Sequence, residues 1–309
     1  GLDHVILVKV ASTAVISAML GLNKEQTIDA LSQAWVDGQS LRTYRHAPNA
    51  GPRKSWAAGD ATSRALQLVL LTQKGQIGYP SVLTTPTWGF YDVQFKGEQF
   101  SLPREFTSYV MENVLFKISF PAEFHAQTSV EAAVILHEEI KDRIDEIETV
   151  EITTHESAIR IISKEGTLNN PADRDHCIQY MTAIGLLKGD LVAEDYEDDV
   201  ASDPRIDELR SKMVIKEDER YTKEYLEEDK RSIANAIVIH FKDGSSTEKV
   251  EVEYPIGHRR RREQGIPLLI EKFKANLSTQ FSENRTKEIL SLCEDQSTLE
   301  NSTVIDFMN

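Results

Sequence analysis

The stretch IANAIVIHFKDGSSTEKVEVEY, residues 233–254, decides the fold of the central part of the chain. Residues 233–241 and 249–254 are rich in valine or isoleucine and predict two β-strands. Asp243-Gly244 lies between them, and this pair is a strong signal for the tight turn of a hairpin. We therefore expect two antiparallel strands here.

The segments before this hairpin extend a mixed α/β pattern toward the N-terminus. Residues 148–154 alternate Val150 and Ile152 with polar neighbours, which is typical of a strand. Residues 130–143 have the apolar spacing of an amphipathic helix, and a further helix is predicted from about residue 174 to residue 187. The middle of the chain is therefore expected to be an α+β unit.

Helical patterns precede this unit. Residues 2–20 are mostly apolar or small and predict a buried helix that ends at Gly21. Asn23 begins a second helix, with Gln26 three residues later, as in a capping box. A third helix is predicted for residues 55–74, and the small side chains of its first turns would let another helix or a ligand approach closely.

The C-terminal end is helical again, with helices near residues 266–280 and 283–293. The order of helices, α/β elements and helices predicts a mainly α fold with an α+β insert, in which one helical domain is interrupted. We expect residues 1–116 to form part of the helical domain and residues 117–258 to form the insert. Residues 259–309 are expected to return to the helical domain.

The 309 residues contain 35 Lys and Arg against 50 Asp and Glu, a net charge of −15. Such a surface repels nucleic acid and anionic lipid, so an anionic ligand would need a local cationic pocket. No apolar run approaches the roughly 18–20 residues of a membrane span. Cys177 and Cys293 are too few for a four-cysteine site and are expected to be buried thiols. Because the chain starts at Gly1 and enters an apolar run at once, we interpret it as a piece of a longer protein.

The sequence contains no phosphate loop, dinucleotide fingerprint, nucleophile elbow or HExxH zinc motif. The polar loop before the third helix does concentrate positive charge. Its cationic or potentially cationic members are Arg42, Arg45, His46, Arg53 and Lys54. A solvated loop and an anion-binding loop explain this cluster about equally well. Lys54 lies at a helix start, where a surface lysine is the common case, but an inward amine and the helix amides would together hold a carboxylate.

Three more residues are candidates for chemistry. His4 stands among apolar residues at a helix start, as a core or cap histidine or as an acid/base. His125 follows Phe120-Pro121-Ala122 at a predicted domain boundary. Tyr180 lies on the inner side of a predicted helix, as a packed ring or as a hydroxyl that binds substrate.

His258 and residues 259–262 form a basic turn. Since no aromatic residues are interleaved with it and no nucleic-acid module is present, we interpret it as a solvated turn or a subunit contact.

Several long blocks of the sequence together resemble a known family. They are GLDH and LVKVAST within residues 1–13, AWVDGQSLR at 34–42, RKSWAAGD at 53–60, NNPADRDH at 169–176 with the following Gln179-Tyr180, and YPIGH at 254–258. These blocks resemble the MmgE/PrpD family, and the resemblance covers essentially the whole chain.

The resemblance implies an all-helical domain interrupted by a smaller α/β lid domain, and a homodimer. It also implies a hydro-lyase that dehydrates 2-methylcitrate to 2-methyl-cis-aconitate, in the methylcitrate cycle of propionate catabolism. No iron–sulfur cluster, metal or other cofactor is expected. The alternatives are dehydration of citrate, decarboxylation of cis-aconitate, or an inactive fragment that serves as a structural or dimer scaffold. The expected compartment is the cytoplasm for a bacterial source and the mitochondrial matrix for a fungal one.

The resemblance also implies roles for single residues. His4, Lys54 and Tyr180 match positions that cis-aconitate decarboxylase uses, so we expect them to be catalytic: His4 as acid/base, Lys54 as carboxylate ligand and Tyr180 as substrate-orienting group or proton donor. Substrate-binding roles are expected for Arg45, Arg53 and His125, although the spacing around His125 departs from the family pattern. The family's first helical stretch, with its Asp- and His-bearing segment, has no counterpart here, so the partner base is expected there. We expect these groups to gather in one crevice beneath the insert.

Overall fold

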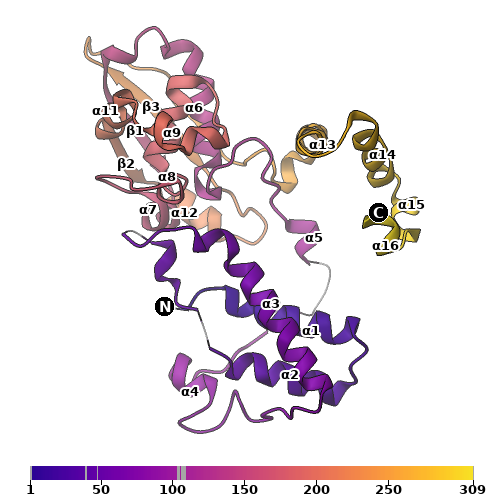
Figure 1. Ribbon diagram of the computed structural model, residues 1–309. Helices are drawn as coiled ribbons and strands as arrows, with labels where there is room; N and C mark the ends of the chain where they lie inside the picture. The colour runs from indigo at the N-terminus through magenta and orange to yellow at the C-terminus, as the bar shows by residue number, and fades with distance from the viewer. Residues whose placement is uncertain (1, 39, 47, 103–104, 106–108, 309) are drawn as a thin grey trace. The chain divides into compact units, whose positions relative to one another are not determined.

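The computed structural model describes residues 2–38, 40–46, 48–102, 105 and 109–308 (Figure 1). Gly1 and Gln39, which belong to the family-like blocks, lie outside them. The fold is mainly helical with one small mixed sheet, so the predicted fold class is confirmed. The chain forms two compact units: the first contains residues 1–107 and 168–173, and the second contains residues 108–167 and 174–309. The expected return of residues 259–309 to the helical domain stays a prediction.

The first unit is built on three helices, and its other elements are short. Its elements are α1 (Val5–Met19), α2 (Lys24–Val36), the 3₁₀ helix η1 (Arg42–Arg45), α3 (Arg53–Gln73) and α4 (Phe90–Phe95). The predicted capping box starts α2: the Asn23 side chain accepts from the Gln26 backbone N–H at 2.9 Å, and the Gln26 side chain accepts from the Asn23 N–H at 3.1 Å. Small side chains let α3 pack closely on α1, where Ala57 and Ala61 join Val5 in a buried cluster.

Helix α1 differs from the buried helix that its hydropathy predicts. Its buried positions include Lys9 and Thr13, whereas Leu7, Val15 and Met19 are 60%, 58% and 78% exposed. The polar side of α1 can be buried because its polar groups are hydrogen-bonded. The Thr13 hydroxyl donates to the Lys9 carbonyl at 2.8 Å, and the Lys9 amine donates to the Asp37 carboxylate. The apolar side of α1 is consequently left uncovered.

The second unit contains a four-stranded sheet in the order β2-β1-β3-β4. The strands are β1 (Ile147–Thr154), β2 (Met213–Glu217), β3 (Asn235–Phe241) and β4 (Val250–Val252). β1 pairs with β2 in parallel, and the other two pairings are antiparallel. The predicted hairpin is confirmed, with Ile237 opposite Val250 and a turn at Gly244, whose φ of 83° suits glycine.

Helices α6 (Gln127–Ile140) and α9 (Ile178–Lys188) pack against each other, and α6 contacts β3 and β4 (Figure 1). Apolar and polar side chains alternate along β1, and the apolar residues Val150 and Ile152 are fully buried. Gly185 lets the two helices approach closely, since a Cβ there would lie 2.9 Å from the Ala133 Cβ.

Shorter elements complete the second unit. They are α5 (Tyr109–Asn113), η2 (Phe124–Ala126), η3 (Ile144–Glu146), α7 (Glu156–Ile162), η4 (Ala193–Tyr196), α10 (Asp198–Ala201), α11 (Pro204–Ser211) and α12 (Glu219–Leu226), while α8 (Pro171–Arg174) lies where the chain changes units. The acidic stretch 194–203 buries two of its side chains, Asp195 and Tyr196. Asp195 can be buried because it accepts from the Val192 N–H at 2.8 Å and forms an ion pair with Lys188.

The C-terminal part contains η5 (Arg259–Arg261), α13 (Arg262–Ser278), α14 (Glu283–Glu294), α15 (Gln296–Asn301) and α16 (Val304–Met308). The basic turn makes contacts within its own unit: Arg261 forms an ion pair with Glu131 at 2.8 Å, and Arg259 donates to the Asp229 carbonyl at 2.5 Å. Both cysteines are free, but only Cys177 is the buried thiol expected from sequence, because Cys293 is half-buried. Among the helices described, none is long and apolar enough to cross a membrane.

Candidate functional site

Arg45 is placed by an ion pair at the start of the first unit. Its Nε donates to Oδ2 of Asp3 at 2.5 Å, and Asp3 also accepts from the Val5 N–H at 3.1 Å. The Asp3 side chain is fully buried, and burial acts to raise its pKa. The hydrogen bond and charge of Arg45 outweigh that effect and hold the pKa of Asp3 below its usual range. The buried pair therefore stays charged and fixes the loop that carries Arg45 beside the start of α1.

His4 is neither a core histidine nor a bonded cap. Its side chain is 56% exposed, and Nδ1 lies 3.5 Å from Oδ1 of Asp3. Partial burial lowers the pKa of His4, and the positive charges of Arg45 and Arg42 act in the same direction, whereas Asp3 opposes them. The imidazole is thus neutral near pH 7 and able to accept a proton.

Lys54 is half-buried, and its amine is hydrogen-bonded to the main chain. It lies in the first turn of α3, and its Nζ donates to the carbonyl of Ala172 at 2.5 Å. The segment that carries Ala172 makes a second hydrogen bond to the loop before α3: Asn170 Nδ2 donates to the Ala50 carbonyl at 3.3 Å. The family-like block at residues 169–173 is thereby held against the family-like block that starts α3, within one unit.

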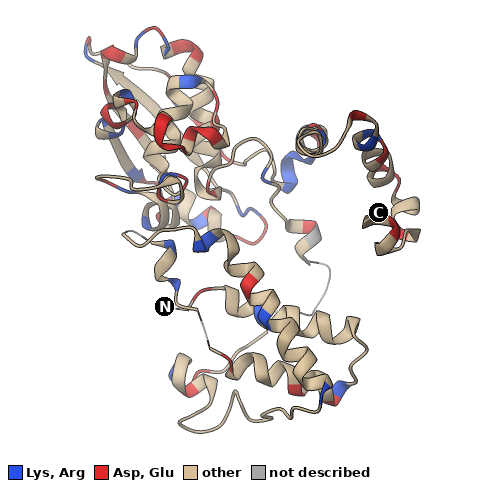
Figure 2. Ribbon diagram, in the orientation of Figure 1, with Lys and Arg blue, Asp and Glu red and all other residues tan. Residues whose placement is uncertain are grey.

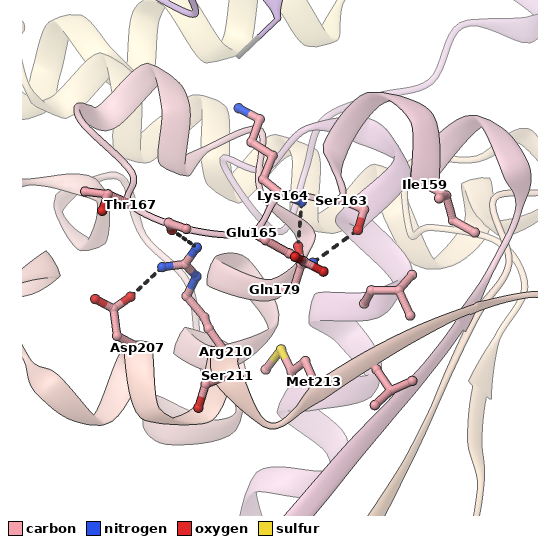
Figure 3. Close-up of a pocket in the computed structure, with 13 residues that line it drawn as sticks. Ile159, Ser163, Lys164, Glu165, Thr167, Gln179, Asp207, Arg210, Ser211 and Met213 are labelled. Carbon is pink, nitrogen blue, oxygen red and sulfur yellow. Dashed lines mark hydrogen bonds and ion pairs between the residues drawn. The ribbon is translucent and has the colours of Figure 1, made fainter. Parts of the chain in front are cut away.

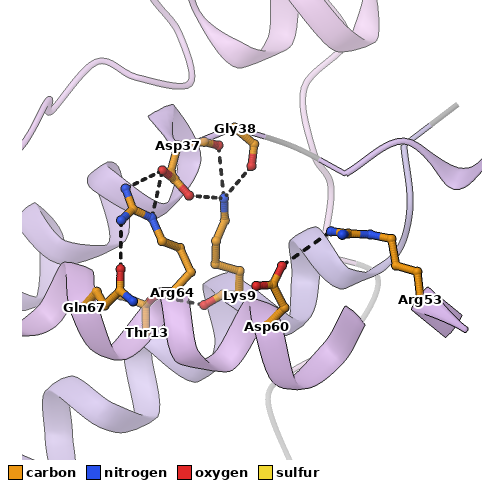
Figure 4. Close-up of polar contacts among 8 residues, drawn as sticks. All are labelled: Lys9, Thr13, Asp37, Gly38, Arg53, Asp60, Arg64 and Gln67. Atoms are coloured by element: carbon orange, nitrogen blue, oxygen red, sulfur yellow. Dashed lines mark hydrogen bonds and ion pairs between the residues drawn. The ribbon is translucent and has the colours of Figure 1, made fainter. Parts of the chain in front are cut away.

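Arg53 lies on the same turn of α3, over aromatic side chains. Its guanidinium carbon is 4.3 Å from the centre of the Trp56 ring and 5.5 Å from that of Tyr44. Its Nη2 lies 3.4 Å from Oδ2 of Asp60, an exposed ion pair seen in Figure 4. Exposed pairs of this kind are weak, so the contact leaves the guanidinium able to exchange partners.

Lys9 forms a buried network that the sequence did not single out. Its amine is bound by Oδ2 of Asp37 at 3.1 Å and by the Asp37 and Gly38 carbonyls at 3.0 and 3.1 Å (Figure 4). Arg64 reaches the other carboxylate oxygen of Asp37 at 2.8 Å. The network joins α1, the end of α2 and α3, and so fixes the helices that carry the loop. In the sequence, this network was indicated by Lys9 alone, a charged residue within an apolar run.

His125, in the second unit, lies between a carboxylate and a phenol. Its Nδ1 is 2.7 Å from Oε1 of Glu123, and its Nε2 is 3.1 Å from the hydroxyl of Tyr225. The His125 and Glu123 side chains are only 12% and 15% exposed. Burial acts to raise the pKa of Glu123, but the hydrogen bonds and charge of His125 outweigh it and hold that pKa below its usual range. The arrangement is a carboxylate–imidazole pair suited to proton transfer.

His155 adds a second imidazole to this cluster. It is fully buried and stacks on Tyr225 with ring centroids 4.5 Å apart and an interplanar angle of 14°. Burial is the main cause that lowers its pKa to about 4, so the ring is neutral. Sequence reasoning missed His155, Glu123 and Tyr225, because tertiary contacts bring together segments up to about a hundred positions apart. Only Glu123, two residues before His125, gave a local signal.

Tyr180 is buried on α9, as the sequence predicts. Its hydroxyl donates to the Asp195 carbonyl at 2.6 Å, and its side chain is only 2% exposed. Burial raises the pKa of Tyr180 to about 12, which keeps the hydroxyl protonated. A direct contact with substrate would require this hydroxyl to exchange its present acceptor.

A pocket of about 800 Å³ lies elsewhere in the second unit, between α7, α9, α11 and β2 (Figure 3). Arg210 in its wall is bound to Asp207 and donates to the Gly166 carbonyl at 2.9 Å. Gln179 accepts from the Lys164 N–H at 3.1 Å and donates to Ser163 at 3.1 Å. None of the site residues expected from the sequence lines this pocket.

The expected site residues are divided between the two units. The first unit holds His4, Lys54, Arg45 and Arg53, and the second holds His125 and Tyr180. Asp3 brings His4 and Arg45 together, while the expected common crevice stays a prediction. Over the described ranges, no group of three or more His, Cys, Asp or Glu side chains is placed to hold a metal ion.

Comparison with known proteins gives matches over nearly the whole chain. The MmgE/PrpD N-terminal domain matches residues 1–103, and the MmgE/PrpD C-terminal domain matches residues 120–296. A 2-methylcitrate dehydratase of Escherichia coli (strain K12) is 61% identical over 100% of this chain and 65% of its own length. The mitochondrial 2-methylcitrate dehydratase of Yarrowia lipolytica is 62% identical over 94% of this chain and 56% of its own length. The 2-methylcitrate dehydratase-like protein oryR of Aspergillus oryzae is 47% identical, covering 63% of its own length. The chain thus spans 56–65% of the length of these relatives.

Proposed function

We propose, from the premise that this chain belongs to the MmgE/PrpD family, that it is part of a hydro-lyase that dehydrates 2-methylcitrate to 2-methyl-cis-aconitate. The observation that carries the proposal is the identity of 61% and 62% to 2-methylcitrate dehydratases of a bacterium and a yeast. Such a reaction belongs to the catabolism of propionate.

The reaction sets requirements that named side chains can meet. Dehydration removes a proton next to a carboxylate and expels a tertiary hydroxyl. Negative charge grows on that carboxylate as the proton leaves, so cationic donors stabilise the transition state more than the substrate. The departing hydroxyl needs a proton from a general acid, because hydroxide is a poor leaving group.

The first unit supplies a base and cationic groups in this proposal. His4 acts as acid/base, supported by its exposed, neutral imidazole. Lys54 binds a substrate carboxylate and stabilises its charge, supported by a half-buried amine that the Ala172 carbonyl holds in place. Arg45 and Arg53 bind the other carboxylates, and the exposed Arg53–Asp60 pair is the easier of the two to exchange.

The second unit supplies hydrogen-bonding groups. His125 binds substrate, supported by its place between Glu123 and Tyr225. Tyr180 orients substrate or donates to the leaving oxygen, supported by a hydroxyl that stays protonated. A short buried bond to the Asp195 carbonyl has to be exchanged for that role.

The proposal extends to partners and location. The substrate is a small tricarboxylate, and the whole protein is a homodimer. Nucleic acid is not an expected partner, because the net charge of −15 repels it. We propose the cytoplasm for a bacterial source and the mitochondrial matrix for a fungal one, since the Yarrowia lipolytica relative is described as mitochondrial.

Product analysis tests the reaction. The full chain is incubated separately with 2-methylcitrate, citrate and cis-aconitate, and the products are identified by mass spectrometry. We expect loss of water from 2-methylcitrate at a higher kcat/KM than from citrate, without release of carbon dioxide from cis-aconitate. Decarboxylation of cis-aconitate, or faster dehydration of citrate, would replace the proposed reaction with another, and no turnover would favour a scaffold.

A further inference from the structure

We infer that Glu123, His125 and Tyr225 form an acid–base relay that ends at a pocket for a small carboxylate, with Tyr225 as the group that exchanges a proton with the ligand. The inference deepens the proposed function, on which it rests for the identity of the reaction. It gives His125 a role in proton transfer and assigns two residues that the proposal above leaves unused.

The contacts of Glu123 determine which nitrogen of His125 carries the proton. One carboxylate oxygen, Oε2, accepts from the backbone N–H of His125 at 2.8 Å, and the other, Oε1, lies 2.7 Å from Nδ1. An ionised carboxylate can only accept, so the ring proton is on Nδ1. In the neutral ring Nε2 then has a free lone pair, which accepts the Tyr225 hydroxyl at 3.1 Å. The three groups are therefore linked in one direction, from phenol to imidazole to carboxylate.

Tyr225 also lines a pocket of about 290 Å³ together with Arg231, Arg259 and His258. Arg259 donates to the neutral oxygens of Asn113 and the Asp229 backbone. Among the residues that the structure describes, no carboxylate forms an ion pair with Arg231 or with Arg259. Two uncompensated positive charges in a chain of net charge −15 favour a carboxylate ligand.

The backbone at Arg231 supports this assignment. Its φ of 46° lies in the left-handed region, which costs free energy for a residue other than glycine. Arg231 is exposed on the rim of the pocket and follows directly after the end of a turn. A strained position that presents an uncompensated charge to a pocket is more easily explained by a ligand than by stability.

His155 holds the phenol ring of Tyr225 in place. The two rings are nearly parallel, and both ring nitrogens of His155 are buried without a hydrogen-bond partner among the described groups. Burying such nitrogens costs stability, because their hydrogen bonds to water are lost. The stacked ring gives the Tyr225 hydroxyl a fixed direction toward Nε2 of His125.

The proton transfer balances within these groups. A ligand proton passes to the Tyr225 oxygen while the Tyr225 proton passes to Nε2 of His125. The electron pair of the broken bond stays with the ligand, where the guanidinium groups offset its charge. The resulting imidazolium lies against the Glu123 carboxylate, so no further reactant is required.

Nitrogen NMR of the full chain, labelled with ¹⁵N-histidine, tests the relay without relying on catalysis. At about pH 8 we expect His125 to be the Nδ1–H tautomer, as its contacts with Glu123 and Tyr225 require. Glu123→Gln should move the proton to Nε2. The backbone N–H of His125 would keep its hydrogen bond to the side-chain oxygen of the glutamine, so the glutamine NH₂ would face Nδ1. Because that NH₂ is a donor, Nδ1 must then be the acceptor. An Nε2–H tautomer in the unmodified chain would overturn the relay.

Calorimetry tests the pocket with tricarballylate, a tricarboxylate without a hydroxyl to eliminate. Arg231→Gln should weaken binding roughly tenfold or more, the range for a hydrogen bond to a charged group. Arg285→Gln, which removes an arginine on α14, is the matched control and should bind as the unmodified chain does. Equal binding by the Arg231 variant would overturn the pocket assignment.

Kinetics on 2-methylcitrate separates this inference from the proposed function. Tyr225→Phe keeps the ring but should lower kcat by on the order of 10²-fold with little change in KM. Tyr221→Phe, four residues earlier on α12, should retain the full rate. If the unmodified chain dehydrates 2-methylcitrate and Tyr225→Phe is equally fast, the relay fails and the proposed function stands. If the tautomer and the tricarballylate binding are as expected but no dehydration occurs, the proposed function fails and the relay stands.

Discussion

Asp3 accepts from Arg45 and from the backbone of Val5, and Lys54 donates to the carbonyl of Ala172. At the scale of the residue, these contacts keep charged groups of the first unit inside the protein, where they act at fixed positions. Asp3 and Ala172 could not be assigned as partners from the sequence, because contacts over 42 and 118 positions decide them. Lys54 itself could be identified, because the family-like block around it is long.

Lys54→Met should reduce kcat/KM for 2-methylcitrate by on the order of 10²–10³, because the growing carboxylate charge loses a donor. The side chain keeps its length, so the fold should be retained. The measurement is steady-state kinetics, with Lys74→Met at the other end of α3 as control. Near-normal turnover by the Lys54 variant would exclude the proposed role.

His155 predicts an acid-dependent loss of stability. Its pKa is about 4 in the folded chain and about 6.5 when unfolded, so between these values the unfolded state binds more protons. The free energy of unfolding is therefore highest above pH 6.5 and falls by roughly 3 kcal/mol as the pH drops to about 4. Urea unfolding across this range measures it.

The variant His155→Phe keeps an aromatic ring against Tyr225 and should flatten that pH dependence. His240→Gln, on the exposed side of β3, is the control and should leave the slope as it is. An unchanged slope in the His155 variant would mean that this ring is not buried in neutral form.

At the scale of the element, α2, α3, β1 and the hairpin were predictable because local chemistry determines them. The capping box at Asn23 and the Asp243-Gly244 turn involve only neighbours in sequence. Strand β2 and helix α12 were missed, since β2 is a short edge strand whose partner β1 lies some sixty positions away. Helix α1 was recognised, but its buried side was not, because the partners of Lys9 lie just after the end of α2, some thirty positions away.

Gly185 makes the packing of α6 on α9 testable. Gly185→Ala should destabilise the fold by about 1–3 kcal/mol, because the added methyl meets Ala133 at 2.9 Å. Ala133→Gly in the same chain should restore part of the loss. Gly59→Ala is the matched control in α3, where nothing lies within 4 Å, and should stabilise by about 0.5–1 kcal/mol. Thermal unfolding measures all three, and a neutral Gly185→Ala would show that the helices are further apart.

At the scale of the whole molecule, uncovered apolar side chains predict association. The exposed members on α1 and α3 include Leu7, Val15, Met19, Leu66 and Leu70. Exposed apolar side chains that gather on one surface drive contacts with other apolar surfaces. Figure 2 shows how few charged residues interrupt these helices, whereas charges of both signs are interspersed along the α/β part.

We expect the apparent mass in sedimentation equilibrium to exceed 34.9 kDa as the concentration rises. The triple variant with lysine at positions 7, 15 and 19 should stay at the monomer mass. Ile135→Lys, which changes one exposed apolar residue on α6, should associate as the unmodified chain does. A monomeric unmodified chain at all concentrations would show that this face does not self-associate.

Residues 168–173 belong to the first unit although the chain on both sides of them belongs to the second. The polypeptide therefore crosses between the units three times, and no single peptide-bond cleavage can release one intact unit from the other. After a protease nick near residue 107, residues 168–173 would be part of the second piece but would still pack in the first unit. The two pieces would therefore stay together through this segment, which carries Ala172. A piece ending at that nick would lack the acceptor for Lys54, so genetic truncation there removes part of what orients this amine.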